Sequence, residues 1–172
     1  MARPEPTGVE RRFDESQLIV SKTDLNGRIT YANRTFIEVC GYSEAELLGK
    51  PHSIVRHPAM PRSAFALMWE TISSGREFFG YVINLCKNGD HYWVLAHVTP
   101  SLGVGGEIIG YHSTRRVPES RAIAVVEPLY AELVEVEQRA PSKASAVEAG
   151  VQSLTEVLKQ KGVEYDELVL TI

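Results

Sequence analysis

Residues 80–100 read GYVINLCKNGDHYWVLAHVTP, and this stretch decides the fold. Its two arms are rich in Val, Ile, Tyr and Trp, which are residues that favour β-strands. Between the arms stands Asn88-Gly89, the dipeptide most typical of the tight turn in a β-hairpin. The stretch therefore predicts two antiparallel strands joined by a short turn.

The same pattern occurs twice more along the chain. Residues 18–33, LIVSKTDLNGRITYAN, alternate apolar and polar side chains on either side of Asn26-Gly27 and predict an earlier hairpin. A glycine-rich stretch at residues 102–106 leads into IIGYHSTRRV, residues 108–117, which predicts a further strand. Together these segments predict an antiparallel sheet of about five strands.

The segment between the two hairpins, residues 33–75, has a helical pattern instead. It contains NRTFIEVCGY, SEAELLGK and PRSAFALMWETISSG, three short stretches with helical spacing of apolar residues. Ser43 and Glu46 have the spacing of a capping box, and Pro61 suits the first turn of the third helix. The expected fold class is α+β, with short helices on one face of the sheet.

A helical hairpin is expected after the sheet, at residues 119–139 and 142–161. Ser142 can cap the second helix and Gly162 can end it. Pro128 should kink the first helix or mark its true start. The final residues, EYDELVLTI, are too short to assign. Apolar side chains recur at heptad spacing at Ala122, Val126, Leu129, Leu133 and Val136, and at Ala144, Val147, Val151, Leu154 and Leu158.

Charge separates three segments of the 172-residue chain. Residues 1–16 carry a net charge of −1, residues 17–118 carry +2 and residues 119–172 carry −5. We interpret these as an N-terminal cap segment, a sensor domain and a helical tail.

The composition excludes several classes of protein. A total charge of −4 gives no basic face for nucleic acid. The two cysteines, Cys40 and Cys86, cannot form a disulfide scaffold or a multi-cysteine metal site. No stretch approaches the roughly 18 apolar residues of a membrane span, and no signal peptide opens the chain. We expect a cytoplasmic protein without membrane insertion.

The order of two strands, short helices and three strands resembles a PAS domain. The match becomes specific in the run RHP-x-MP at residues 56–61, and in KNGDHYWV at residues 87–94. With residues 23–50 and GYHSTRR at residues 110–116, these motifs resemble the flavin-binding PAS sensor of bacterial aerotaxis receptors. The resemblance covers more than half of the chain.

This resemblance implies an FAD held without a covalent bond between sheet and helices. Two positions depart from the family pattern: Ala59 replaces a common Asp, and Phe78 replaces a Trp. The cofactor-binding residues that the resemblance implies are Asn33, Arg56, His57, Phe65, Trp69, Phe78, Asn84 and Trp93.

The residue chemistry is consistent with that cofactor. Arg56 offers a planar fork for phosphate oxygens. Phe65 and Trp69 are four residues apart, so on a helix they share one face and can form an aromatic wall. Asn84 carries both a donor and an acceptor, which matches the alternating edge of a flavin ring.

Other interpretations remain open from the residues alone. FMN fits the same chemistry, and His52 or His57 could bind haem. A PAS module without cofactor, used for dimerisation or capture of a small ligand, is a further alternative. Residues 51–61 contain no cysteine for a light-driven flavin adduct. Neither a metal site at His91, His97 and His112 nor an enzyme signature is expected.

The function expected from the resemblance is sensing of redox state or oxygen, of the aerotaxis or energy-sensing type. The signal would pass through the helical tail to a signalling partner, a receptor or a kinase pathway. The tail helices are too short to be stable alone in water. They are therefore expected either to cover the sheet of their own domain or to form a four-helix homodimer interface.

Overall fold

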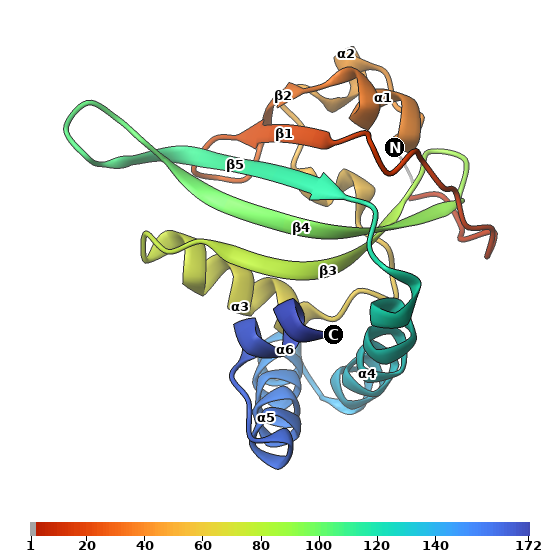
Figure 1. Ribbon diagram of the computed structural model, residues 1–172, viewed down its shortest axis with the longest axis vertical. Helices are drawn as coiled ribbons and strands as arrows, with labels where there is room; N and C mark the ends of the chain where they lie inside the picture. The colour runs from red at the N-terminus through yellow and green to blue at the C-terminus, as the bar shows by residue number, and fades with distance from the viewer. Residues whose placement is uncertain (1–2) are drawn as a thin grey trace.

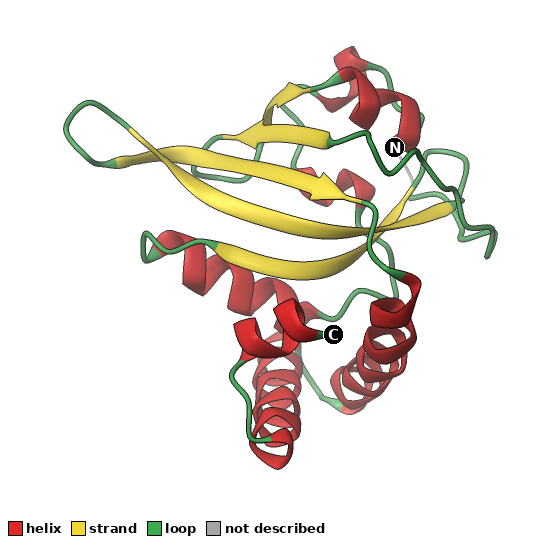
Figure 2. Cartoon of the chain, in the orientation of Figure 1, coloured by secondary structure: helices red, strands yellow, loops and turns green. Residues whose placement is uncertain are grey.

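The computed structural model describes residues 3–172 as one sheet flanked by helices (Figures 1 and 2). All neighbouring strands are antiparallel, and their order across the sheet is β2-β1-β5-β4-β3. The strands are β1 (Ile19–Thr23), β2 (Ile29–Ala32), β3 (Phe78–Leu85), β4 (His91–Leu102) and β5 (Ile108–Arg116). This arrangement confirms the predicted five-stranded sheet.

The predicted turns and caps explain where the elements begin and end. Gly27 and Gly89 both have φ in the left-handed region, at 73° and 92°, where glycine avoids the steric penalty of a Cβ. Ser43 forms the predicted capping box with Glu46. The helices of this half are α1 (Arg34–Cys40), α2 (Glu44–Leu47), the 3-10 helix η1 (His52–Val55) and α3 (Arg62–Ser73).

Side-chain alternation gives the sheet two different faces. On β4, Tyr92 and Val94 point to the inner face, where they join Phe36 of α1 in a buried cluster. Trp93 lies between them in sequence and belongs to a second cluster, formed with the C-terminal helices. The sheet thus separates an inner face, covered by α1, η1 and α3, from an outer face (Figure 1).

The tail packs on its own domain. It forms α4 (Ser120–Arg139), α5 (Lys143–Lys161) and α6 (Tyr165–Thr171), which lie beside β3 and α3 in Figure 1. Ser142 caps α5 and Gly162, at φ 68°, ends it, as predicted. The tail therefore covers part of the outer face, which is one of the two uses expected for its apolar stripes.

Three details of the tail differ from the sequence-based expectations. The buried stripe of α4 includes Tyr130 and Glu137 in place of Leu129 and Val136. The stripe of α5 is Ala146, Gly150 and Leu154, so only Leu154 of the five expected residues belongs to it, and Ala144, Val147, Val151 and Leu158 lie outside. Short side chains let α5 approach its neighbours closely, whereas a heptad pattern assumes a seam between larger residues. Residues 165–171 form α6, for which no helix was predicted.

Pro128 lies inside α4 without marking its start, because the helix begins at Ser120. Proline removes one backbone donor and disfavours a straight helix. Among residues 3–172, none of the helices combines the length and apolar character needed to cross a bilayer.

Candidate functional site

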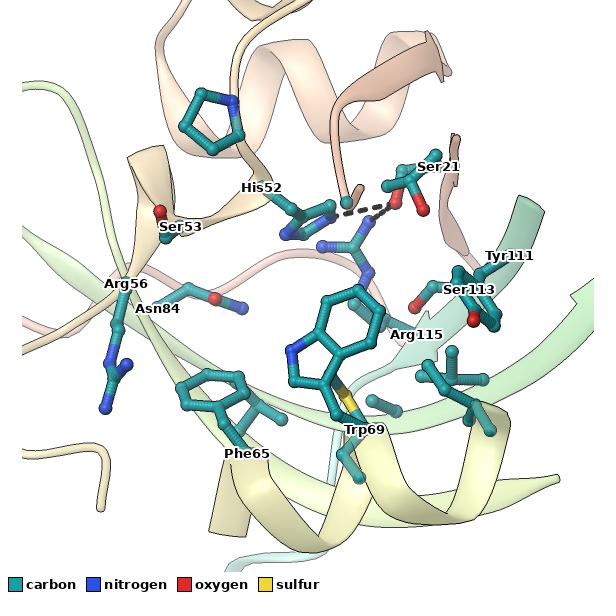
Figure 3. Close-up of a pocket in the computed structure, with 18 of the residues that line it drawn as sticks. Ser21, His52, Ser53, Arg56, Phe65, Trp69, Asn84, Tyr111, Ser113 and Arg115 are labelled. Atoms are coloured by element: carbon teal, nitrogen blue, oxygen red, sulfur yellow. Dashed lines mark hydrogen bonds between the residues drawn. The ribbon is translucent and has the colours of Figure 1, made fainter. Parts of the chain in front are cut away.

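A cavity of about 270 Å³ lies between the inner face of the sheet and the helices η1 and α3 (Figure 3). Its walls are mainly apolar, with a few polar side chains. This is the usual composition of a pocket for a small organic ligand or cofactor. The side chains that line it include Ser21, His52, Arg56, Phe65, Trp69, Asn84, Tyr111, Ser113 and Arg115.

Aromatic rings form one wall. Phe65 and Trp69 both line the cavity from α3, as their four-residue spacing predicts. The ring of Trp69 packs edge-on against Tyr111 of β5, with centroids 5.4 Å apart. A Cβ at Gly27 would come within 3.1 Å of this indole, so the glycine turn leaves room for the ring. The wall offers flat apolar surface on which a planar ligand can stack.

A polar cluster of Arg115, Ser21 and His52 also lines the cavity, with the Arg115 guanidinium between His52 and Trp69 (Figure 3). The guanidinium of Arg115 donates from Nη2 to the Ser21 hydroxyl at 2.5 Å, and the same hydroxyl lies 3.0 Å from Nε2 of His52. Because the hydroxyl accepts from Arg115, its own hydrogen can go to Nε2. His52 then carries its ring proton on Nδ1.

His52 is neutral in this setting. Burial, together with the positive charge of Arg115, lowers the pKa of His52 to about 3. Its ring stacks on Phe36 with centroids 5.7 Å apart, and the Arg115 guanidinium lies 4.5 Å from the same ring. The cluster therefore carries one positive charge, on Arg115, at neutral pH.

Two donors in the cavity wall have no partner within the described chain. The Asn84 side chain is 4% exposed, and its Nδ2 makes no hydrogen bond; neither does Nε of Arg115. Leaving a buried donor unsatisfied costs about 1–3 kcal/mol. These atoms are therefore places where a bound molecule would accept hydrogen bonds.

Arg56 stands at the mouth of the cavity. Its guanidinium lies 4.5 Å from the ring centroid of Phe65, and Nη2 donates to the Met60 carbonyl at 3.3 Å. A second cleft, about 450 Å³, shares Ser53 and Arg56 with the first and adds Arg3 and Arg62, with the Glu137 carboxylate also in its lining. Burial lowers the pKa of Arg56, and the neighbouring positive charges of Arg62 and Arg3 act in the same direction. This mouth is suited to an anionic group.

Four of the residues implied by the family resemblance do not line the cavity. Asn33 caps α1, where its side chain accepts from Phe36 N and Val20 N. His57 accepts from Ala59 N at 3.1 Å, and its ring packs against His91. Phe78 stacks on Tyr165 of α6, with centroids 5.6 Å apart.

Trp93 lies on the outer face, because it is paired with Ile83 while its neighbour Tyr92 is paired with Asn84. Its ring lies 6.2 Å from that of Tyr130 in α4. Of the implied set, the fold thus brings Arg56, Phe65, Trp69 and Asn84 together.

Ser21, Tyr111, Ser113 and Arg115 line the cavity without having been singled out from the sequence. Three of them alternate along β5, so strand periodicity places them on one face. The available signal for Arg115 was its spacing from Tyr111, because residues four apart on one strand point to the same face.

Comparison with known proteins identifies the family. A family model described as the PAS fold matches residues 9–115. The chain belongs to the PAS family. It is 51% identical over 112 residues to the aerotaxis receptor of Escherichia coli (strain K12), which covers 65% of this chain and 22% of that receptor. It is also 32% identical over 103 residues to the nitrogen fixation regulatory protein of Klebsiella pneumoniae, covering 60% of this chain and 21% of that protein.

The chain spans about a fifth of the length of these two relatives. Solved structures share the fold at lower identity. The light state of the Aureochrome1 LOV photoreceptor has a TM-score of 0.57 at 23% identity, covering 73% of this chain and 94% of that one. A light-oxygen-voltage domain studied with a flavin analogue has a TM-score of 0.59 at 21% identity, covering 68% and 90%.

Proposed function

We propose that this chain is a flavin-binding PAS sensor that responds to redox state or oxygen. The observation that carries the proposal is the inner-face cavity, which combines the aromatic wall of Phe65 and Trp69 with the unpartnered amide of Asn84. A flat heteroaromatic ring needs both an apolar surface and hydrogen bonds at its edge. A bound flavin would supply a ring that accepts and returns electrons.

We propose FAD in preference to FMN. The second cleft supports this choice because it continues from the first at Ser53 and Arg56 and its lining holds Arg3 and Arg62; the one carboxylate in the lining, Glu137, already accepts hydrogen bonds from Arg62 N and Ser63 N. A dinucleotide extends beyond its ring through two phosphates, which suit arginine side chains. FMN carries one phosphate and no adenosine, so it would use less of this cleft.

We further propose that the tail passes the signal on to a partner protein, of a receptor or kinase pathway. The helix that carries Phe65 and Trp69 also receives the tail: Glu137 of α4 accepts hydrogen bonds from Arg62 N and Ser63 N at the start of α3. A shift of α3 would thus act directly on α4. Homodimerisation through the tail stays a prediction.

Spectroscopy of the purified chain tests the cofactor. The protein should be yellow, and denaturation should release FAD that mass spectrometry identifies. Flavin-free protein should then bind FAD more tightly than FMN, and Arg62→Gln should reduce that preference while leaving FMN affinity unchanged. Colourless protein that binds neither flavin after reconstitution would instead favour a PAS module without cofactor.

A further inference from the structure

Arg115 is a buried cation without a buried anion beside it. Arg115 is only 3% exposed and lies in β5, the central strand of the sheet. No ion pair within residues 3–172 includes Arg115, and the described lining of the cavity contains neither Asp nor Glu. Burying an unpaired charge lowers the stability of the folded protein, because the charge loses its hydration. A buried cation without an anion in the protein therefore indicates that a bound anionic group offsets this cost.

The guanidinium is held in place but not satisfied. Ser21 accepts from Nη2 at 2.5 Å, and the Phe36 ring lies 4.5 Å from the central carbon. Nε is buried and has no hydrogen-bond partner in the described chain. Neutral His52 adds no charge of its own to this end of the cavity. Positive charge and a free donor therefore meet at one fixed point inside the pocket.

The two arginines of the cavity have different positions. Figure 3 shows Arg56 at the edge of the view with its guanidinium turned away, whereas Arg115 lies between His52 and Trp69. Arg56 belongs to the mouth and to the second cleft. The part of a ligand that reaches Arg115 is therefore the part enclosed in the cavity, namely the ring.

We propose that Arg115 is the fixed counter-charge for negative charge that the enclosed ring acquires on reduction. This inference rests on the proposed flavin site. An oxidised flavin ring is neutral; taking up two electrons and one proton leaves it with a net charge of −1, the electrons coming from an external reductant. A preorganised positive charge in a low-dielectric site stabilises that product more than the neutral reactant. Arg115 thereby raises the reduction potential of the bound flavin.

The test compares three substitutions in flavin-loaded protein. Arg115→Gln removes the charge and keeps a donor, and Arg115→Lys keeps the charge. Arg116→Gln is the matched control, because Arg116 is the exposed next residue of β5 and its loss changes the net charge equally. For each protein, the affinity for oxidised FAD is measured by titration. The midpoint potential is measured by spectroelectrochemistry, with the electrode supplying the electrons.

Arg115→Gln should weaken binding of the reduced ring relative to the oxidised ring by about tenfold or more. A tenfold change lowers the potential of a two-electron couple by about 30 mV. Arg115→Lys should recover most of this loss, and Arg116→Gln should match the wild type. Equal potentials in Arg115→Gln and wild type would overturn the inference while leaving the flavin site intact. A wild type that binds no flavin would overturn both. If Arg115→Gln does not fold, Arg115→Lys alone decides. A potential equal to that of wild type supports the proposal that the positive charge raises the potential, and a potential about 30 mV lower overturns it.

Discussion

Two charged side chains are buried in the described chain, Arg115 on the inner face of the sheet and Glu137 between the tail and α3, and their surroundings differ. On the inner face, Arg115 makes one side-chain hydrogen bond, to Ser21, and keeps a free Nε. At the junction of the tail with α3, Glu137 is 8% exposed and accepts from Arg62 N, Ser63 N and the Ser63 hydroxyl at 2.8–2.9 Å.

The difference distinguishes a binding group from a structural one. Glu137 sits at the start of α3, where unpaired N–H groups and the helix dipole favour an anion, so its site is complete. Gly150 of α5 fits against it so closely that a Cβ would lie 2.7 Å from the carboxylate. Arg115 has no such complement within the protein. A ligand can complete the hydrogen bonding of Arg115, whereas Glu137 needs none.

Substituting the two tryptophans should separate the faces most strongly. Trp93→Ala, on the outer face, should cost about 3–5 kcal/mol of unfolding free energy, as large aromatic deletions in cores do. Its flavin affinity, measured on the folded fraction, should stay within about twofold of wild type. Trp69 is 38% exposed, so Trp69→Ala should cost less stability and weaken flavin binding about tenfold. Urea unfolding measures the loss of stability, and flavin titration measures the loss of affinity. Weaker flavin binding in Trp93→Ala than in Trp69→Ala would contradict a flavin site on the inner face.

Removing the buried carboxylate should have the next largest effect. Glu137→Ala leaves the start of α3 without its acceptor, and hydrogen bonds to charged groups contribute about 1.5–3 kcal/mol each. We expect a loss of about 3 kcal/mol in flavin-free protein, measured by urea unfolding. Glu132→Ala, an exposed residue on the same helix, should change stability by less than about 0.5 kcal/mol. Equal stabilities for the two variants would mean that Glu137 does not hold the tail.

Acidity should act on the inner face through His52. Its pKa is about 3 when folded and about 6.5 when unfolded, so below pH 6.5 the unfolded chain binds the extra proton. Stability should therefore fall as the pH drops, by about 2 kcal/mol between pH 6.5 and 4.5. His52→Gln should flatten this part of the pH profile in flavin-free protein. A profile as steep as that of wild type would assign the effect to other groups.

The elements with local signals were predictable from sequence. Asn26-Gly27 and Asn88-Gly89 fix their turns through backbone conformation, and the Ser43 and Ser142 caps act within three residues. Phe65 and Trp69 share a helix face for the same local reason. Such features depend on neighbours along the chain, so the sequence reveals them directly.

Features that depend on distant partners were not predictable. The face taken by Trp93 follows from strand register, which hydrogen bonding across the sheet sets. From sequence alone Glu137 is expected to be a surface carboxylate, because its partners lie in α3, far away along the chain. It is buried at the position in the α4 stripe where Val136 was expected. Helix α6 has seven residues and depends on packing against β3 for its stability.

The most direct test of the account is the stability gained from oxidised FAD, measured as the shift in unfolding temperature in three proteins. Wild type should gain stability on adding saturating FAD. Asn84→Ala should unfold at about the wild-type temperature without FAD, because its Nδ2 has no partner to lose, and should gain much less from the same FAD concentration. Trp93→Ala, which removes a buried ring of the outer face, should unfold at a lower temperature with or without FAD and keep the full gain. A wild type that gains nothing, or an Asn84→Ala protein that keeps the full gain, would contradict the claim that a flavin binds on the inner face and accepts a hydrogen bond from Asn84.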